Sequence, residues 1–237
     1  MTSLQIFCLG SPRVLLNQTP VELGRRTTVA LLVYLAVTNH PQNRDAIATL
    51  LWPEAGQSQA HKALRRNLTL LTQAIGKQWF VIERDTIGLN LAATPWVDVH
   101  HFQQWVEANG ADGQAASKQA IALYQDDFLR GFTLPASPPF DEWQFFQTEH
   151  YRQTYAQALE KLVQHHTEQA DYPTALDYAL RRLALDALHE PAQRTLMQLY
   201  AWAANRPRRC INMINVFGCW RPNWTPRPKR RQHSYTA

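Results

Sequence analysis

The chain has 237 residues, a formal net charge of +5, and 45% hydrophobic and 11% aromatic residues, which suits two small domains with packed cores. No apolar run approaches the roughly 20 residues of a membrane-spanning helix, and the N-terminus lacks the basic-then-apolar pattern of a signal peptide. Two of the three cysteines lie in the last 30 residues, so no disulfide framework is indicated and a cytoplasmic location is expected.

The net charge hides an uneven distribution along the chain. Residues 1–91 hold nine Lys and Arg against five Asp and Glu, whereas residues 92–205 hold seven against 14, so these parts carry +4 and −7. Residues 206–237 hold eight basic residues and no acidic ones. A modestly basic first part beside an acidic second part fits a nucleic-acid-binding module joined to a protein-binding one.

The N-terminal part is predicted to form short strands and then two helices. Alternating apolar residues predict strands at 4–9, 13–16 and 21–23, with turns at 10–12 and 17–20. Thr27 or Thr28 is expected to cap the first helix. Asn43 or Asp45 is expected to cap the second, and Pro53 to stop it.

Residues 58–75 are predicted to form one helix with two unlike faces. Its apolar residues recur at steps of four, three and four, and therefore stack on one side: Leu64, Leu68, Leu71 and Ile75. The opposite side carries Lys62, Arg66, Thr69 and Gln73, with Arg65 beside them. Such cations, hydroxyls and amides reach phosphates and base edges in a DNA major groove. A solvated polar face on an ordinary surface helix is the structural alternative.

A hairpin is expected after this helix, with strands at 79–82 and 86–89, and Gly76 is expected to end the helix. Strands, three helices and a hairpin, in that order, indicate the winged variant of the helix-turn-helix, whose third helix enters the major groove. The candidate DNA-binding residues are Lys62, Arg65, Arg66, Thr69, Gln73 and, on the wing, Arg84. For Arg84, a solvated hairpin tip paired with Glu83 or Asp85 stays an open alternative.

Two motifs of this first part resemble a known family. Residues 45–53 end in Leu51-Trp52-Pro53, and residues 63–68 place Arg65 and Arg66 within the third helix. These residues resemble the DNA-binding domain of the Streptomyces antibiotic regulatory proteins, and the N-terminal strands resemble the OmpR/PhoB type of winged helix. The resemblance implies sequence-specific binding to double-stranded DNA. Trp52 is expected to anchor the second helix against the third.

From Trp96 onward the sequence predicts helices, with helical spacing at 120–124, 151–162 and 172–185. Residues 124–132 and the motif Phe140-Asp141-Glu142-Trp143 resemble the signature of the bacterial transcriptional activator domain. Residues 170–197 are similar to a tetratricopeptide helical hairpin, whose repeat is ~34 residues. The aromatic side chains of the signature are expected in the core, with a partner-binding patch as the alternative: Phe128, Phe132, Phe140 and Trp143.

The expected fold class is an α+β N-terminal winged helix-turn-helix at 1–93 followed by an all-α tetratricopeptide-like activator domain at 94–207, which is expected to be truncated. Residues 208–237 are expected to be an aberrant, disordered tail. The resemblance implies a transcription regulator, in particular an activator, with double-stranded DNA, a second copy of the chain and RNA polymerase as partners. The alternative from another class is a helical-repeat adaptor that binds protein and not DNA.

Signatures of enzymes and metal sites are absent from the sequence. The pairs His100-His101 and His165-His166 point to different sides of a helix and have no partner at zinc-like spacing, so no metal is expected. There is no GxxxxGK[ST] loop and no GxSxG motif, so neither a cofactor nor an enzymatic activity is expected. Asp126-Asp127 lies in an acidic region where solvated carboxylates are common.

The residues from about 208 onward break the helical pattern. Residues 170–172 recur as 204–206, so another helix is expected near Pro207, yet Trp, Pro and Arg residues follow. A frame shifted by one base would restore an amphipathic helix; the codon overlap at Met213-Ile214, for example, forces Asp. We therefore predict a frameshift, with a genuine basic DNA-binding arm as the alternative.

Resequencing the gene tests this prediction. We expect an inserted or missing base near codon 208, and an amphipathic helix encoded in the shifted frame beyond it. An unchanged gene sequence, together with a tail peptide detected by mass spectrometry in the printed frame, would contradict the frameshift.

Overall fold

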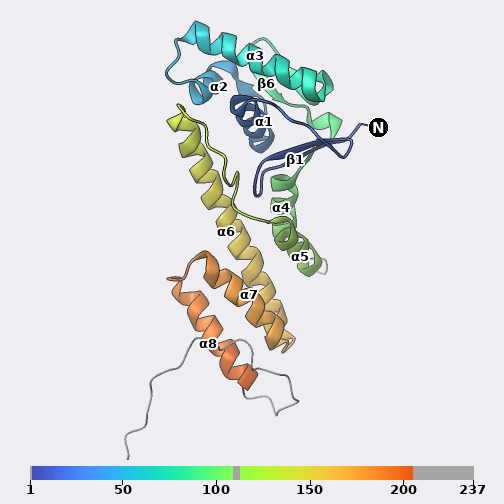
Figure 1. Cartoon of the computed structure of the whole chain (residues 1–237). Coiled ribbons are helices and arrows are strands. Elements are labelled where there is room, and N and C mark those ends of the chain that lie inside the picture. Colours follow the sequence, from blue (N-terminus) through green and yellow to red (C-terminus); the bar gives the residue numbers. More distant parts are fainter. Residues whose placement is uncertain (1, 109–112, 205–237) are drawn as a thin grey trace, which may run out of the picture.

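A computed structural model describes residues 2–108 and 113–204. Four short strands form the first sheet, in the order β3-β2-β1-β7. They are β1 (Leu4–Phe7), β2 (Arg13–Leu16), β3 (Thr19–Pro20) and β7 (Trp96–Val97). β1 runs antiparallel to β2 and parallel to β7. The edge strand beside β1, which is β7, therefore follows the wing in the sequence (Figure 1).

Three helices and a hairpin follow the first three strands. The helices are α1 (Arg26–Thr38), α2 (Arg44–Leu51) and α3 (Gln57–Ile75), and the 3-10 turn η1 (Lys77–Trp79) follows. β4 (Gln42–Asn43), β5 (Phe80–Ile82) and β6 (Thr86–Leu89) form a second sheet in the order β4-β6-β5. A second 3-10 turn, η2 (Leu91–Ala93), leads to β7. This is a winged helix-turn-helix, which confirms the first half of the predicted fold class.

The rest of the described chain is helical after β7. The helices are α4 (Asp98–Glu107), α5 (Gly113–Leu123), α6 (Pro138–Glu168), α7 (Tyr172–Leu185) and α8 (Glu190–Ala204). The 31-residue α6 begins beside α2 and runs away from the winged helix to the α7–α8 hairpin (Figure 1). The second half of the predicted fold class, an all-α repeat-like region, is also confirmed. In the described residues, no helix has both the length and the apolar run required to cross a membrane.

The structure corrects the predicted third strand. Asn17 and Gln18 have φ values of 52° and 66°, so they form a two-residue turn and the chain pairs again at once as β3. Residues 21–23 continue past the strand, although the Val21 N–H still donates to the Val14 carbonyl at 2.9 Å. Pro20 fits β3 because this strand lies at the edge of the sheet, where a missing N–H is tolerated.

Two further predictions were wrong at the ends of elements. Trp96 and Val97 form β7, not the start of a helix, because they pair with Gln5 and Ile6 of β1. Neither predicted threonine caps α1; its N-cap residue, Arg25, makes no side-chain cap bond. For α2 the prediction of Asn43 is confirmed, since its side chain accepts the Asp45 N–H at 2.7 Å.

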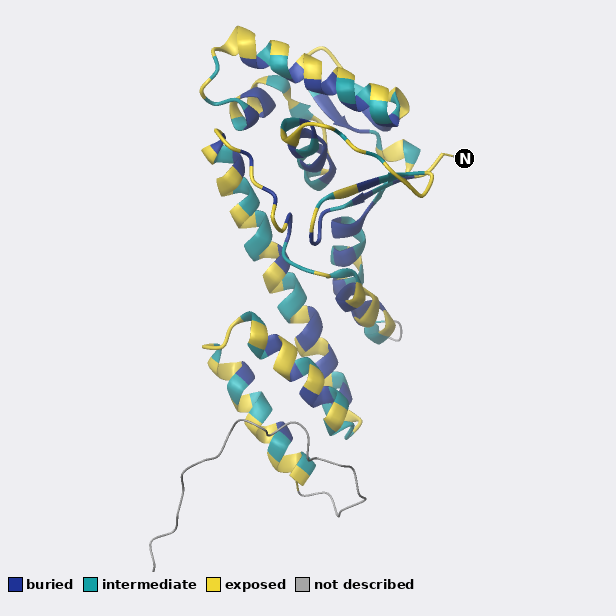
Figure 2. Ribbon diagram, in the orientation of Figure 1, coloured by how far each residue is buried: buried dark blue, intermediate teal, exposed yellow. Residues whose placement is uncertain are grey.

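One hydrophobic core runs from the N-terminal sheet into α4 and α6. Leu4 and Ile6 of β1 belong to the same buried cluster as Phe102 of α4 and Tyr151 of α6. Figure 2 shows buried positions continuing from the sheet along the inner faces of these helices. The predicted boundary between residues 93 and 94 leaves β7 on the helical side, although β7 pairs with β1 of the first sheet. Core packing also crosses this position, so a domain boundary here stays a proposal. A separate small cluster joins the end of α6 to α7 and α8.

The signature aromatics pack into this core, as predicted. Phe128 and Phe140 are 1% and 0% exposed, Phe132 is buried, and Trp143 is half-buried against them. The turn that carries Phe128 also reaches the sheet: the Leu129 N–H donates to the Cys8 carbonyl at 2.8 Å. The turn at 127–130 thus attaches the helical region to the end of β1. The predicted tail at 208–237 lies outside the described residues.

Asp98, the first residue of α4, ties that helix to the same end of β1. Its carboxylate accepts the backbone N–H groups of Cys8 and Leu9 at 2.6 and 2.8 Å. Burial raises the pKa of Asp98 to about 6, although the N–H donors of Leu9, Cys8 and Val99 act in the opposite direction. Between about pH 4 and pH 6, the Asp98 carboxyl is therefore protonated in the native chain and ionised in the unfolded chain.

We predict that Asp98 ionisation lowers stability as the pH rises through this window. The difference in free energy of unfolding between Asp98→Asn and the wild type should increase by about 2–3 kcal/mol, in favour of the variant, from about pH 4 to pH 7. The reason is that only the wild type acquires a buried charge at the higher pH. Urea unfolding at a series of pH values measures this difference, with Glu107→Gln at the exposed end of α4 as control. A difference that does not change with pH would contradict the prediction.

Candidate nucleic-acid interface

The interface is built on α3, whose sequence gives it one buried and one exposed side. The buried residues recur at helical spacing: Ala60, Leu64, Asn67, Leu68, Leu71 and Ile75. They pack towards α1 and α2 and belong, apart from Ala60 and Asn67, to the main hydrophobic core. Gly76 ends the helix with φ 103° and donates its N–H to the Thr72 carbonyl, as expected of a glycine C-cap.

The opposite side of α3 carries the predicted residues, and all of them are exposed: Lys62, Arg65, Arg66, Thr69 and Gln73. Figure 2 shows exposed positions along the outer side of this helix. The Thr69 hydroxyl donates to the Arg65 carbonyl at 2.9 Å, which leaves its oxygen free to accept another hydrogen bond. The structure thus brings these five side chains to one surface, and their contact with DNA stays a prediction.

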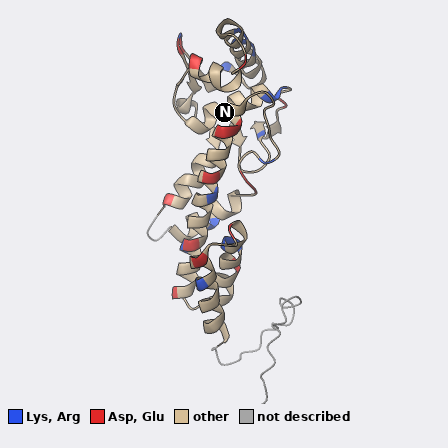
Figure 3. Ribbon diagram, turned by 90° about the vertical axis from the view of Figure 1, so that its left-hand side faces the viewer, with Lys and Arg blue, Asp and Glu red and all other residues tan. Residues whose placement is uncertain are grey.

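The cations of this surface have no acidic partner in the described part of the chain. Within residues 2–108 and 113–204, no ion pair involves Lys62, Arg65, Arg66 or Arg84. Arg84 is exposed at the tip of the wing, between Glu83 and Asp85. The Glu83 carboxylate accepts the Thr86 hydroxyl at 3.0 Å instead of pairing with Arg84. Acidic positions recur along the helical part of the molecule (Figure 3).

A polar hollow of about 510 Å³ lies between α3, the start of α2 and the wing. It is lined by Asn43, Arg44, Asp45, His61, Arg65, Glu83, Arg84 and Asp85. His61 Nε2 lies 2.6 Å from Asp45 Oδ1, and the hydrogen bonds from His61 and then Gln57 lower the pKa of Asp45. Three arginines and three carboxylates therefore line one hollow at the point where wing and third helix meet.

Arg44 holds the wing in place, a role that its local sequence does not predict. Its guanidinium donates to the Glu83 carbonyl at 2.9 Å, and its backbone N–H donates to the Asp85 carbonyl at 3.0 Å. Gly88 brings the wing close to the preceding loop, since a Cβ atom there would lie 3.0 Å from the Pro41 Cα. The residues around Arg44 do not indicate this role, because the two carbonyls that it binds lie about 40 residues later in the sequence.

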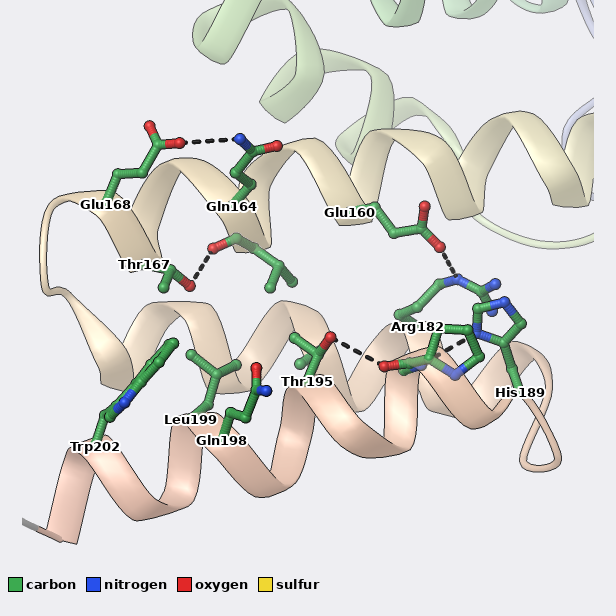
Figure 4. A pocket seen from close by; sticks show the side chains of 14 residues that line it. Glu160, Gln164, Thr167, Glu168, Arg182, His189, Thr195, Gln198, Leu199 and Trp202 are labelled. Carbon is green, nitrogen blue, oxygen red and sulfur yellow. Dashed lines mark hydrogen bonds and ion pairs between the residues drawn. The ribbon is translucent and has the colours of Figure 1, made fainter.

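A second hollow lies far from α3, between α6, α7 and α8. This groove of about 570 Å³ has Trp202 and Leu199 at one end and Arg182 and His189 at the other (Figure 4). Arg182 Nε donates to Glu160 at 2.7 Å, so the main cation of the groove is paired. In the part of the chain that the structure describes, no cluster of three or more His, Cys, Asp or Glu side chains could hold a metal ion.

Comparison with known proteins supports the fold. No protein-family model and no curated protein sequence matches the chain. A solved structure, Mycobacterium tuberculosis EmbR in complex with a low-affinity phosphopeptide, is similar with a TM-score of 0.67 and 18% sequence identity. The match covers 86% of this chain and 56% of the EmbR chain, so this chain spans little more than half the length of that protein. The likeness shows a shared fold.

We predict that Arg44→Met loosens the wing without unfolding the protein. Loss of the bond to the Glu83 carbonyl should reduce the free energy of wing opening by about 1 kcal/mol, which is roughly a fivefold faster amide exchange at Glu83. Hydrogen exchange measured by mass spectrometry or NMR tests this expectation. The control is Arg25→Met, an exposed arginine before α1; equal exchange at Glu83 in both variants would contradict the role of Arg44.

Proposed function

We propose that this protein is a sequence-specific DNA-binding transcription regulator, and that α3 enters the major groove of double-stranded DNA. One observation carries the proposal: α3 buries its apolar side in the core and presents three arginine or lysine side chains without an acidic partner among the described residues. An unpaired cationic face on the third helix of a winged helix-turn-helix is the arrangement that binds DNA phosphates and base edges.

Each side chain has a role that follows from its chemistry. Lys62, Arg65 and Arg66 bind backbone phosphates, which contributes most of the affinity and makes it depend on salt. Thr69 and Gln73 have donors and acceptors that suit base edges, so they contribute to specificity. Arg84 extends from the wing towards the neighbouring backbone or minor groove.

The helical region gives the regulator its protein contacts. We propose that it dimerises through this region, reads repeated half-sites, and activates transcription through contact with RNA polymerase. The support is the resemblance of residues 124–143 to the bacterial transcriptional activator domain, and the repeat-like packing of α7 on α6 and of α8 on α7. Stacked helical hairpins typically present extended surfaces to other proteins.

An adaptor that binds protein alone is the second candidate, and the groove between α6 and α8 favours it. The two candidates differ in a single measurable property, because an adaptor needs no affinity for DNA. The test therefore uses the full chain and a duplex enriched by that chain from a random-sequence library.

We predict that Lys62→Ala with Arg66→Ala weakens binding to this duplex and reduces its salt dependence. Loss of two phosphate contacts should reduce the slope of log K against log salt by about 2. Fluorescence anisotropy at several salt concentrations measures both quantities. The matched control is Lys118→Ala with Arg194→Ala, which removes two exposed cations from α5 and α8 and changes the net charge equally.

The two double variants separate the alternatives. Equal binding by both would contradict the assignment of the α3 face. Failure of the wild-type chain to enrich any duplex would contradict DNA binding itself and favour the adaptor.

A further inference from the structure

Asn67 is a polar residue inside the buried stripe of α3. It is 3% exposed and lies among Leu64, Leu68 and Leu71, where an apolar residue would fit the pattern. A buried amide costs free energy unless its hydrogen bonds are satisfied. Its burial in the stripe therefore requires hydrogen-bond partners within the protein.

The Asn67 side chain joins α3 to the first turn of α1. Its Oδ1 accepts the Thr28 hydroxyl at 2.7 Å and the Thr27 hydroxyl at 3.0 Å. Its Nδ2 donates to the Ala63 carbonyl, one turn earlier in α3, at 2.8 Å. Thr28 is fully buried, so its hydroxyl has no water to bind instead. The two threonines that could have capped α1 serve this contact between helices.

These hydrogen bonds add a directional restraint on the rotation of α3 about its axis to the restraint from apolar packing. A buried hydroxyl or amide that loses its partner costs about 1–3 kcal/mol. A rotation of about 20° would move an atom some 6 Å from the helix axis by about 2 Å. That displacement would separate the amide from both hydroxyls.

The same rotation would move the opposite face of α3 by as much. Successive residues turn by about 100° around an α-helix, so Lys62 and Thr69 lie about 140–160° around the axis from Asn67. Hydrogen bonds on the buried side therefore set the position of the side chains on the exposed side. A base-edge contact tolerates less displacement than a phosphate contact, because its donors and acceptors must align with a particular base.

We propose that Asn67, together with Thr27 and Thr28, is a positioning residue that sets the rotational position of α3 and thereby the sequence specificity of DNA binding. The proposal rests on the proposed function, and it assigns Asn67 no contact with DNA. Loss of the hydrogen bonds should reduce discrimination between duplexes far more than it reduces affinity for DNA in general.

Matched variants of the full chain test the hydrogen bonds separately from shape. Thr27→Val with Thr28→Val removes both hydroxyls and keeps the side-chain shape, whereas Thr27→Ser with Thr28→Ser keeps both hydroxyls and removes a methyl group from each. A triple variant, Thr27→Val, Thr28→Val and Asn67→Leu, removes the whole network, and removal of all partners together leaves stability close to that of the wild type. Thermal unfolding measures stability in every variant.

The readout is the ratio of dissociation constants for a scrambled duplex and for the duplex enriched by the wild-type chain. We expect this ratio to decrease about tenfold or more in the valine double and triple variants, and to stay within about twofold of the wild type in the serine variant. Binding to the scrambled duplex should change little in all of them.

A triple variant that folds and keeps the wild-type ratio would overturn the proposal while the proposed function stands. A serine variant that loses as much discrimination as the valine variant would also overturn it, because shape and not hydrogen bonding would then decide. If the wild-type ratio itself is close to one, sequence-specific binding fails, and the positioning role fails with it.

Discussion

The packing of α3 against α1 and α2 positions the candidate nucleic-acid interface. The apolar stripe of α3 is buried in the main core, so the exposed side of the helix is determined by which side is buried. Asn67 restricts the rotation of α3 about its axis, because its hydrogen bonds to Thr27 and Thr28 require one orientation of the helix. Arg44 extends the same arrangement to the wing through the Glu83 carbonyl. Core packing and surface chemistry are therefore coupled in a single helix.

The end of β1 couples the winged helix to the helical region. On one side, Asp98 of α4 accepts the N–H groups of Cys8 and Leu9. On the other, the turn at 127–130 pairs with the same segment, and Asp127 of this turn accepts Arg152 Nε of α6 at 2.8 Å. The long helix α6 is thus held to the sheet by hydrogen bonds as well as by the shared core. A partner bound along α6 would consequently act on a body that is continuous with the surface proposed to bind DNA.

Local sequence patterns were sufficient for the helices, the wing and the exposed face, since helix caps and apolar spacing act over a few residues. Asn43 and Gly76 show this at the ends of α2 and α3. What could not be predicted depends on partners distant in the sequence: β7 pairs with β1 some 90 residues earlier, and Thr28 binds Asn67 across 39 residues. A threonine near a helix start is a typical cap. The acceptor supplied by another helix changes that role.

The exposed side of α3 is proposed to face DNA, and site-specific photo-crosslinking examines this contact. A photoreactive amino acid is placed at Gln73 on α3 or at Gln164 on α6 of the full chain, which is then bound to the enriched duplex and irradiated. We expect crosslinks from position 73 to bases within the enriched motif, and none from position 164. Crosslinks from position 164 with none from position 73 would contradict it.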